Sequence, residues 1–442
     1  MKKVITYGTY DLLHYGHIRL LQRAKALGDY LIVGVTSDDF DISRGKINVQ
    51  QSLMERIEAV RATGLADKIV IEQYEGQKID DIQKYGVDIF TVGSDWVGVF
   101  DYLKEYCEVV YLDRTKGVSS TEIRSKENAL RFGLVGDTDV INKFAIECRN
   151  VNGTEVTGYL SLNPMLGKEG LEGAAAYTSF EDLVHDCDAL YIRSHPTKHY
   201  EQIKYALGQK KHVLYESPLT LNHAQAKELF EMADRNGCIL YAGIKTAYST
   251  AYARMILMAK TGKIGDIVSV DAVCTSLEDD LTKPEMQHVW NSITAWGPTA
   301  MLPVFQLLGT ECVEKHIVSR LLPTGDDFDT FTKIDWTYPN AVASIKVGKG
   351  VKAEGQLIIG GTKGYIYVPA PWWKTDYFEV RFENPAHNKR FFYQLEGEGI
   401  RGMIASFVGS VTRNKLAYIR EKVSLEIVRT MEEWHSGNFT RI

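Results

Sequence analysis

Residues 6–17 read Thr6-Tyr7-Gly8-Thr9-Tyr10-Asp11-Leu12-Leu13-His14-Tyr15-Gly16-His17, and this stretch decides the fold of the first half of the chain. The apolar run 4–7 predicts a first strand, which breaks at Gly8. A helical pattern follows, with two histidines three residues apart where the helix begins. Side chains at i and i+3 share one helix face, and the free N–H groups of a helix start favour phosphate. The stretch predicts a phosphate site for nucleotide chemistry; the alternative is two exposed histidines at a helix cap.

Length and composition limit the classes of protein to which this chain can belong. A chain of 442 residues predicts two or three domains, and 45% hydrophobic with 24% charged residues is typical of a globular protein. The net charge of −6 gives no support for nucleic-acid or membrane-surface binding. No apolar run approaches the roughly 20 residues of a membrane span, so we expect no membrane insertion. Without a signal-peptide pattern, we expect a cytoplasmic protein.

The cysteines point to a reducing compartment. All six are scattered, and none forms a CxxC pair. This spacing argues against a zinc site and against a disulfide framework, so we expect no protein-bound metal and reduced, buried thiols.

Strand and helix signals alternate through the first half. The predicted strands are 4–7, 30–35, 68–71, 88–92 and 107–112, and the predicted helices begin after Gly8, at Ser52, at Lys78 and at Ser119. Such alternation predicts parallel strands with crossover helices, a doubly wound α/β sheet. Ligands of such sheets bind beyond the carboxyl ends of the strands, where the histidine stretch also lies.

Three further clusters follow predicted strands or open a predicted helix. Arg44-Gly45-Lys46 is either a basic loop for an anionic substrate or a solvated loop. Gly93-Ser94-Asp95-Trp96 is either a ligand-binding turn or an ordinary polar turn. The third cluster is either a cradle for a triphosphate or a plain helix cap, and it reads Arg114-Thr115-Lys116-Gly117-Val118-Ser119-Ser120-Thr121-Glu122-Ile123.

Together these elements resemble the HxGH element of the nucleotidyltransferase superfamily. More narrowly, residues 1–127 resemble the bacterial glycerol-3-phosphate cytidylyltransferases, which share a GTFDLLHxGH stretch, a basic loop, a GDDW-like turn and an RTxGxSTT run. The mild departures are Tyr10, Tyr15, Ser94 and Ser120. A sharper departure concerns two family arginines about eight apart: Arg56 matches the first, but Gly64 stands at the second. This leaves the identity of the acceptor open.

The resemblance implies that CTP and a polyol phosphate, glycerol 3-phosphate first, give CDP-glycerol and pyrophosphate with Mg²⁺. By the same resemblance the residues take three roles. The catalytic residues are His14, His17, Lys46 and Arg114. The nucleotide-binding residues are Thr9, Tyr10, Gly16, Asp95, Thr115, Ser119 and Ser120. The acceptor-binding residues are Arg44 and Arg56.

The second half begins without a flexible linker. Strands and helices alternate again up to about residue 243, and strand-like runs of an antiparallel sheet fill the rest. We therefore predict three domains: 1–127, a cytidylyltransferase domain; 128–250, a Rossmann-like domain; and 251–442, an α+β domain with a mostly antiparallel sheet.

Residues 129–442 resemble the Gfo/Idh/MocA oxidoreductases. The resemblance rests on residues 133–136, 196–200, 211–219 and 361–364, with Trp372-Trp373. Thr138 and Ile141 replace small residues of the dinucleotide fingerprint, and Ser217 replaces the lysine of the family's EKP motif. We therefore interpret Gly133, Gly136, Glu216 and Pro218 as a degenerate NAD(P) site. Lys245 and His199 remain as the candidates for catalysis in this half, and a structural role is the favoured interpretation of each.

Three functions are compatible with the sequence. The first is a cytidylyltransferase that makes a CDP-polyol for bacterial envelope polymers, with a second half that has lost hydride chemistry. The second is a bifunctional enzyme whose second half reduces a phosphoketose with NAD(P)H to supply the polyol phosphate. The third is a nucleotide-binding regulatory protein without turnover. Both resemblances imply a homo-oligomer.

Overall fold

The computed structural model describes residues 1–13, 15–43, 49, 51–74, 76–113, 129–163, 166–277, 290–323, 328–393, 395–413 and 417–442. The chain divides into two compact units. Unit 1 comprises residues 1–129 and 150–153, and unit 2 comprises residues 130–149 and 154–442. In the ranges described, no helix combines the length and apolar character needed to cross a bilayer.

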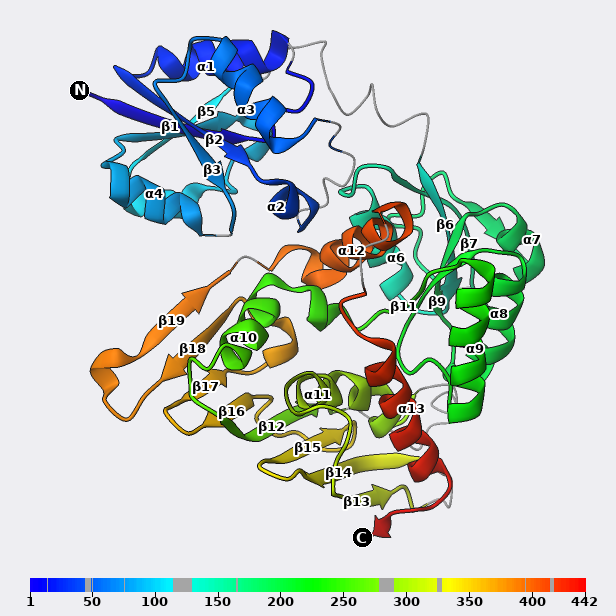
Figure 1. The fold of residues 1–442 in the computed structure, drawn as a ribbon. Coiled ribbons are helices and arrows are strands. Elements are labelled where there is room, and N and C mark those ends of the chain that lie inside the picture. Colours follow the sequence, from blue (N-terminus) through cyan, green and yellow to red (C-terminus); the bar gives the residue numbers. More distant parts are fainter. Residues whose placement is uncertain are drawn as a thin grey trace. The chain divides into compact units, whose positions relative to one another are not determined.

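Unit 1 is a doubly wound α/β sheet, as the sequence predicts (Figure 1). Its described strands pair in the order β3-β2-β1-β4-β5, and every pairing is parallel. The elements are β1 (Lys3–Gly8), α1 (Tyr15–Lys25), β2 (Tyr30–Thr36), α2 (Asp38–Ser43), α3 (Leu53–Ala62), β3 (Lys68–Glu72), α4 (Gln77–Tyr85), β4 (Ile89–Gly93), η1 (Ser94–Trp96), η2 (Asp101–Glu105) and β5 (Glu108–Leu112).

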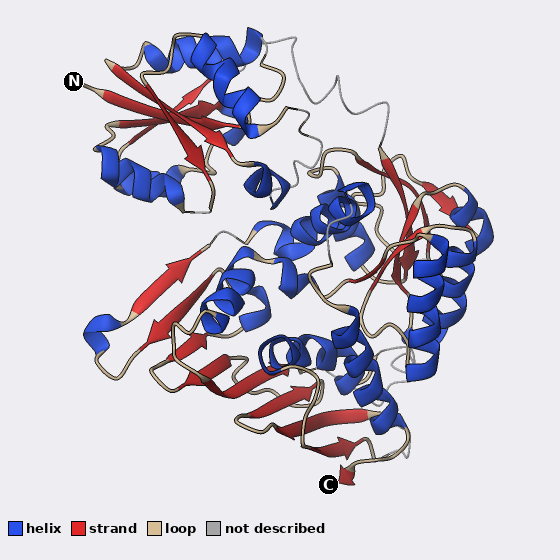
Figure 2. Cartoon of the chain, in the orientation of Figure 1, coloured by secondary structure: helices blue, strands red, loops and turns tan. Residues whose placement is uncertain are grey.

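Alternate residues of the central strands serve two separate cores. Val4 of β1 packs with residues of α1 and α3, whereas its neighbour Ile5 packs with Ile82 of α4. Period-2 alternation in a strand places successive side chains on opposite faces, so helices cover both faces of this sheet (Figure 2). Helix α3 begins with a capping box between Ser52 and Glu55, as a helix starting at Ser52 predicts.

Unit 2 contains two sheets. The first pairs in the order β11-β10-β9-β6-β7-β8 and is parallel among the described strands. Its elements are β6 (Leu130–Gly136), α6 (Val140–Cys148), β7 (Thr154–Leu160), β8 (Ala175–Tyr177), α7 (Phe180–His185), β9 (Ala189–Arg193), α8 (Pro196–Gly208), β10 (His212–Tyr215), α9 (His223–Asn236), β11 (Leu240–Ala242), η3 (Lys245–Tyr248) and α10 (Thr250–Lys260).

The second sheet of unit 2 is mixed and mostly antiparallel, in the order β19-β18-β17-β16-β12-β15-β14-β13-β20 for the residues described. Helix α11 packs on β12, β14 and β15. The elements are β12 (Ile267–Thr275), α11 (Ser292–Leu308), β13 (Glu314–Leu321), β14 (Asp329–Thr337), β15 (Val342–Gly348), β16 (Leu357–Gly361), β17 (Tyr365–Val368), η5 (Trp372–Lys374), β18 (Tyr377–Arg381), η6 (Pro385–His387), β19 (Lys389–Phe392), η7 (Glu396–Gly399), α12 (Ile400–Arg413), α13 (Glu421–His435) and β20 (Thr440–Arg441).

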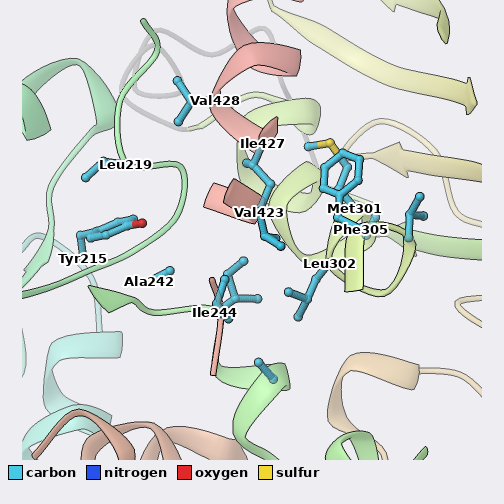
Figure 3. Packing of buried hydrophobic residues seen from close by; sticks show 14 of the residues in the cluster. Tyr215, Leu219, Ala242, Ile244, Met301, Leu302, Phe305, Val423, Ile427 and Val428 are labelled. Carbon is cyan, nitrogen blue, oxygen red and sulfur yellow. The ribbon is translucent and has the colours of Figure 1, made fainter. Parts of the chain in front are cut away.

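One apolar cluster joins the two sheets of unit 2. Tyr215 and Ile244, from the parallel sheet and the segment that follows it, lie in the same cluster as Leu302 of α11 and Ile427 of α13 (Figure 3). The predicted boundary at 250/251 lies between the last strand of the parallel sheet and the first strand of the mixed sheet. Whether it separates two domains stays a prediction, since the apolar cluster extends across it.

The cysteines are all free thiols. Four are buried, and Cys107 and Cys312 are half-buried. Burial raises the pKa of the Cys107 and Cys312 thiols, which keeps them protonated near neutral pH.

Candidate active site

The loop after β1 has an unusual backbone. Tyr10 and Leu12 both adopt positive φ, 53° and 48°, in the left-handed region that non-glycine residues seldom occupy. Side-chain hydrogen bonds hold this shape: the Leu12 N–H donates to Gln51 Oε1 at 2.7 Å, and the Gln51 N–H donates to Asp11 Oδ1 at 2.9 Å. Strain of this kind persists only where the surroundings over-determine it, and it gathers at functional sites.

Arg56 of α3 ties this loop to the neighbouring strand. Its guanidinium donates to the carbonyl oxygens of Thr9 at 2.7 Å and Thr36 at 2.8 Å, and its Nε donates to the Gln51 carbonyl at 3.2 Å. It also forms ion pairs with Asp38 and Asp41 of α2. The Thr9 hydroxyl donates to Asp41 at 2.7 Å, which closes the network.

These contacts bear on the role of Arg56. The resemblance implies that Arg56 contacts the acceptor phosphate, which stays a prediction, whereas in the structure the side chain is fully buried and its nitrogens face five protein groups. A forked guanidinium suits such contacts because it donates in several fixed directions at once. We propose that Arg56 positions the histidine loop.

His17 and Gly16 lie in the first turn of α1, directly beyond the carboxyl end of β1. The first turn of α1 contains no acidic residue, so the positive end of the helix is not neutralised from within. The half-buried His17 ring meets the buried ring of Tyr10 edge-on, with centroids 5.6 Å apart. Burial raises the pKa of Tyr10, which stays neutral and fixes one side of the imidazole.

Asp95 lies on η1, directly after β4, and its side chain is exposed. Strand β4 is the parallel neighbour of β1, and the chain order reverses between these two strands. Asp95, Thr9, Tyr10, Gly16 and His17 therefore come from the carboxyl ends of adjacent strands, at the switch point where doubly wound sheets bind ligands. The other predicted residues lie outside the described ranges: His14, Arg44, Lys46, Arg114, Thr115, Ser119 and Ser120.

In unit 2, the loop after β6 departs from a pyrophosphate-binding turn. A Cβ on Gly136 would stand 3.1 Å from Cγ2 of Ile141, so this glycine accommodates a bulky side chain of its own helix. Asp137 accepts hydrogen bonds from the Ser161 hydroxyl at 3.0 Å and the Leu162 N–H at 2.6 Å. Gly133 lies within β6, where a Cβ would meet Leu183 at 3.0 Å. Both glycines serve packing.

Polar groups gather at the carboxyl ends of β9 and β10. Glu216 accepts a hydrogen bond from the Tyr191 hydroxyl at 2.7 Å, and the Ser217–Pro218 peptide is cis. Ser217 Oγ and Arg193 Nε are buried and have no hydrogen-bond partner among the described residues. The Arg193 guanidinium lies 5.3 Å from the centre of the Trp290 ring.

His199 of α8 is fully buried in the same region. Its Nδ1 lies 3.0 Å from the Pro218 carbonyl oxygen and its Nε2 lies 2.9 Å from the Ser194 carbonyl oxygen. Burial lowers the pKa of His199 to about 4, so the ring is neutral near pH 7. His199 braces the cis turn and is enclosed by main chain, which agrees with its structural interpretation. Sequence reasoning missed Arg193, Trp290 and Tyr191, for which no motif gave a signal.

Comparison with known proteins separates the same two parts. The family described as "Cytidylyltransferase-like" matches residues 5–126, and the family described as "Oxidoreductase family, NAD-binding Rossmann fold" matches residues 130–244. The chain is 52% identical over 124 residues to a glycerol-3-phosphate cytidylyltransferase of Bacillus spizizenii, covering 28% of this chain and 95% of that protein. It is 49% identical over 130 residues to its counterpart in Staphylococcus aureus, covering 28% of this chain and 95% of that protein.

A solved structure matches the remainder. A 3-ketoreductase from Actinomadura kijaniata, solved with NADP and TDP-benzene, covers 71% of this chain and 99% of its own, with a TM-score of 0.61 and 21% identity. At that identity the likeness shows the fold of unit 2.

Proposed function

Because the chain belongs, through unit 1, to the glycerol-3-phosphate cytidylyltransferase family, we propose that unit 1 transfers CMP from CTP to glycerol 3-phosphate. The products are CDP-glycerol and pyrophosphate. A phosphate oxygen of the acceptor attacks the α-phosphorus of CTP, and the bond from that phosphorus to the bridging oxygen breaks. Pyrophosphate leaves with the electron pair. Such transfers depend on positioning and on stabilising the charge that develops on the oxygens.

One observation carries this proposal: His17 stands in the first turn of α1, at the switch point between β1 and β4. In the proposed reaction its imidazole donates a hydrogen bond to the reacting phosphate, while the helix start adds N–H donors. Arg56 and the network around Gln51 fix the loop that leads to this turn. The residues that hold the triphosphate are proposed to be Lys46, Arg114, Thr115, Ser119 and Ser120, with Asp95 and Thr9 on the nucleoside.

Mg²⁺ is proposed as the partner of the triphosphate. Mg²⁺ usually keeps several waters and binds through one or two carboxylates and substrate phosphates, so we propose that the ion enters with CTP. The ion would neutralise charge on the leaving pyrophosphate.

The experiment that tests the transfer presents CTP with one acceptor at a time. The acceptors are glycerol 3-phosphate, ribitol 5-phosphate, ethanolamine phosphate and unphosphorylated glycerol, and both pyrophosphate and the CDP-linked product are measured. We expect product with glycerol 3-phosphate and none with glycerol. Release of pyrophosphate with ethanolamine phosphate alone would assign a different acceptor, and no release with any acceptor would favour a regulatory nucleotide-binding protein.

We further propose that unit 2 keeps the oxidoreductase fold without hydride transfer. The loop after β6 supports this, because Asp137 and Asp139 add negative charge where a pyrophosphate would lie and Ile141 fills the space beside Gly136. Ser217 stands where the resemblance places a lysine. These residues do not fit a tightly held NAD(P).

The alternative is a bifunctional enzyme, and one observation favours it. Ser217 Oγ and Arg193 Nε are buried, unpartnered within the described residues and located at carboxyl strand ends, as ligand-binding groups are. Titration of NADH and NADPH, followed by nicotinamide fluorescence, separates the two proposals. We expect no saturable binding in a sample that turns over CTP; saturation at micromolar cofactor would support the bifunctional enzyme.

A further inference from the structure

Three lysines of the described part of unit 2 converge on one carboxylate. Glu398 Oε2 lies 2.6 Å from Lys245 Nζ and 3.0 Å from Lys374 Nζ, and Glu398 Oε1 lies 3.9 Å from Lys143 Nζ. The four residues come from α6, η3, η5 and η7. Their side chains are 29–44% exposed, so the cluster is accessible to a solute.

The charges of this lysine cluster do not balance. Three ammonium groups share Glu398, and Lys143 also lies 3.8 Å from Asp139, whose side chain is 77% exposed and therefore well solvated. The neighbouring pair of Arg401 and Glu147, 2.8 Å apart, is neutral as a pair. The cluster with Asp139 thus keeps a surplus positive charge. The hydrogen bond from Lys245 lowers the pKa of Glu398 to about 2, so this group is a carboxylate throughout the physiological range.

The cluster lies where a parallel sheet takes its ligands. Lys245 begins η3, which follows β11 after two residues, and Lys143 lies on α6, which follows the loop after β6. Both therefore belong to the carboxyl edge of the parallel sheet. Lys374 approaches from η5 of the second sheet. Three independent elements supply the positive charges, which is not required for helix packing or capping.

Glu398 is carried on an unusual turn. Its φ is 52°, and its neighbours Gly397 and Gly399 have φ of 54° and 86°. The flanking glycines allow close packing, because a Cβ on Gly397 would lie 2.5 Å from the Glu147 carboxylate and a Cβ on Gly399 would lie 2.5 Å from the Lys245 carbonyl oxygen. The turn therefore seats the Glu398 side chain beside Lys245, and rotation of that side chain alone would withdraw the carboxylate from the lysines.

We propose that the lysine cluster is a binding site for a phosphomonoester and that Glu398 occupies it in the absence of this ligand. A phosphate group carries more negative charge and one more acceptor oxygen than a carboxylate, so it satisfies three ammonium groups better. The ligand displaces Glu398, which moves out toward water. The source of the phosphate is either a small polyol or ketose phosphate or the phosphate groups of a nucleotide. The inference stands apart from CMP transfer in unit 1.

Tryptophan fluorescence reports on this site. Trp373 adjoins Lys374, and its ring lies 5.0 Å from that of Trp296. For this experiment Trp96 is replaced in the 442-residue chain by the substitution Trp96→Phe, so that the tryptophan of unit 1 does not contribute to the fluorescence. The resulting chain is titrated at constant ionic strength with inorganic phosphate, glycerol 3-phosphate, dihydroxyacetone phosphate, glycerol and CDP-glycerol.

We expect a saturable change with phosphomonoesters and none with glycerol. Glu398→Gln removes the competing carboxylate and is expected to tighten binding by about tenfold, whereas Lys374→Gln and Lys245→Met weaken it by a similar factor. Lys204→Gln is the control, because Lys204 is paired with Glu228 elsewhere on unit 2. The substitution Trp373→Phe, made while the lysine cluster is intact, removes the reporter and is expected to abolish the fluorescence change.

The outcomes are distinct. Saturation by glycerol 3-phosphate or dihydroxyacetone phosphate assigns a small phosphorylated ligand, and saturation by CDP-glycerol alone assigns a nucleotide; both support a phosphate site. No saturation by any phosphate compound, or saturation unchanged by Glu398→Gln and Lys374→Gln, overturns the proposal. Pyrophosphate release from CTP is measured with the same lysine-cluster substitutions in a chain that keeps Trp96, and this tests unit 1 separately.

Discussion

The guanidinium of Arg56 donates a 2.7 Å hydrogen bond to the carbonyl oxygen of Thr9, 47 residues earlier in the chain. This contact joins α3 to the loop between β1 and the histidine-bearing helix. Since Thr9 also bonds Asp41, and Asp41 pairs with Arg56, the three residues form a closed buried unit. We infer that this buried unit, rather than a direct contact of Arg56 with substrate, holds the histidine loop in place.

Arg56→Lys tests this positioning role. A lysine keeps the charge but cannot reach Thr9, Thr36 and Gln51 together, so the loop loses its anchor. We expect a loss of about 3 kcal/mol in stability, the scale for a broken buried charge network, with a large fall in kcat. Thermal unfolding and pyrophosphate release measure the two effects. Arg61→Lys, at an exposed arginine paired with Glu58, should change neither. A raised KM for glycerol 3-phosphate at unchanged stability would instead show that Arg56 binds the acceptor.

His17→Ala tests the proposed catalytic histidine. Loss of a donor aimed at developing charge lowers kcat by about 10²–10³-fold or more, while the fold stays intact because the ring is only half-buried. The measurement is pyrophosphate release from CTP and glycerol 3-phosphate, with circular dichroism as the check on folding. The matched control is His185→Ala, at an exposed histidine of unit 2. Near-normal release by the His17 variant would remove His17 from the mechanism.

Lys78→Met tests a buried ion pair beneath the sheet of unit 1. Lys78 pairs with Glu72, both almost fully buried, and its Nζ lies 4.9 Å from the centre of the Tyr7 ring. Methionine leaves Glu72 buried without its cation, so we expect a loss of about 3 kcal/mol in the free energy of unfolding. Chemical denaturation measures it. Lys104→Met, which breaks an exposed pair with Asp101, is the control and should leave the unfolding midpoint unchanged.

The buried His199 predicts a pH dependence of stability in unit 2. Its pKa is about 4 in the folded chain against 6.5 for the free side chain. Between these values the unfolded chain binds the proton and the folded chain does not, so stability falls as the pH drops from 6.5 to 4. The contribution approaches about 1.4 kcal/mol per pH unit within this window.

His199→Gln removes this contribution. Unfolding midpoints of the variant and the native chain should diverge least near pH 4 and most above pH 6.5, where the neutral histidine is fully favoured. His185→Gln is the control, because His185 is exposed and its replacement should leave the slope of stability against pH unchanged. Equal slopes of stability against pH for native chain and variant would mean that His199 is not held neutral by burial.

The sequence predicted the elements that carry strong periodic signals. β1 follows from an apolar run that ends at Gly8, α1 from a helical pattern that stops before Gly28, β2 from the apolar run after that glycine, and α3 from Ser52 and Glu55 at its start. Helix α2 was not predicted, because three aspartates fill its six residues and no apolar period marks it. Its ion pairs to Arg56 come from tertiary contact.

The candidate site was predicted only where residues are neighbours in sequence. The histidine stretch carries its own spacing, so His17 and Gly16 could be placed at a helix start. The role of Arg56 could not be predicted, because its acceptor is the main-chain carbonyl of Thr9, and every residue type carries such a carbonyl. The same holds for Lys143, Lys245 and Lys374, which meet at Glu398 only after two sheets share one core.

CMP transfer by unit 1 and the absence of hydride transfer in unit 2 are tested together when the 442-residue chain is supplied with CTP and CDP-glycerol is measured from two starting compounds. One reaction contains glycerol 3-phosphate, and the other contains dihydroxyacetone phosphate with NADH and NADPH. We expect CDP-glycerol and equal pyrophosphate from glycerol 3-phosphate, and neither product nor nicotinamide oxidation from dihydroxyacetone phosphate. CDP-glycerol formed from dihydroxyacetone phosphate, with matching oxidation of the cofactor, would contradict the loss of hydride chemistry in unit 2. Absence of CDP-glycerol from both reactions would contradict CMP transfer to this acceptor by unit 1.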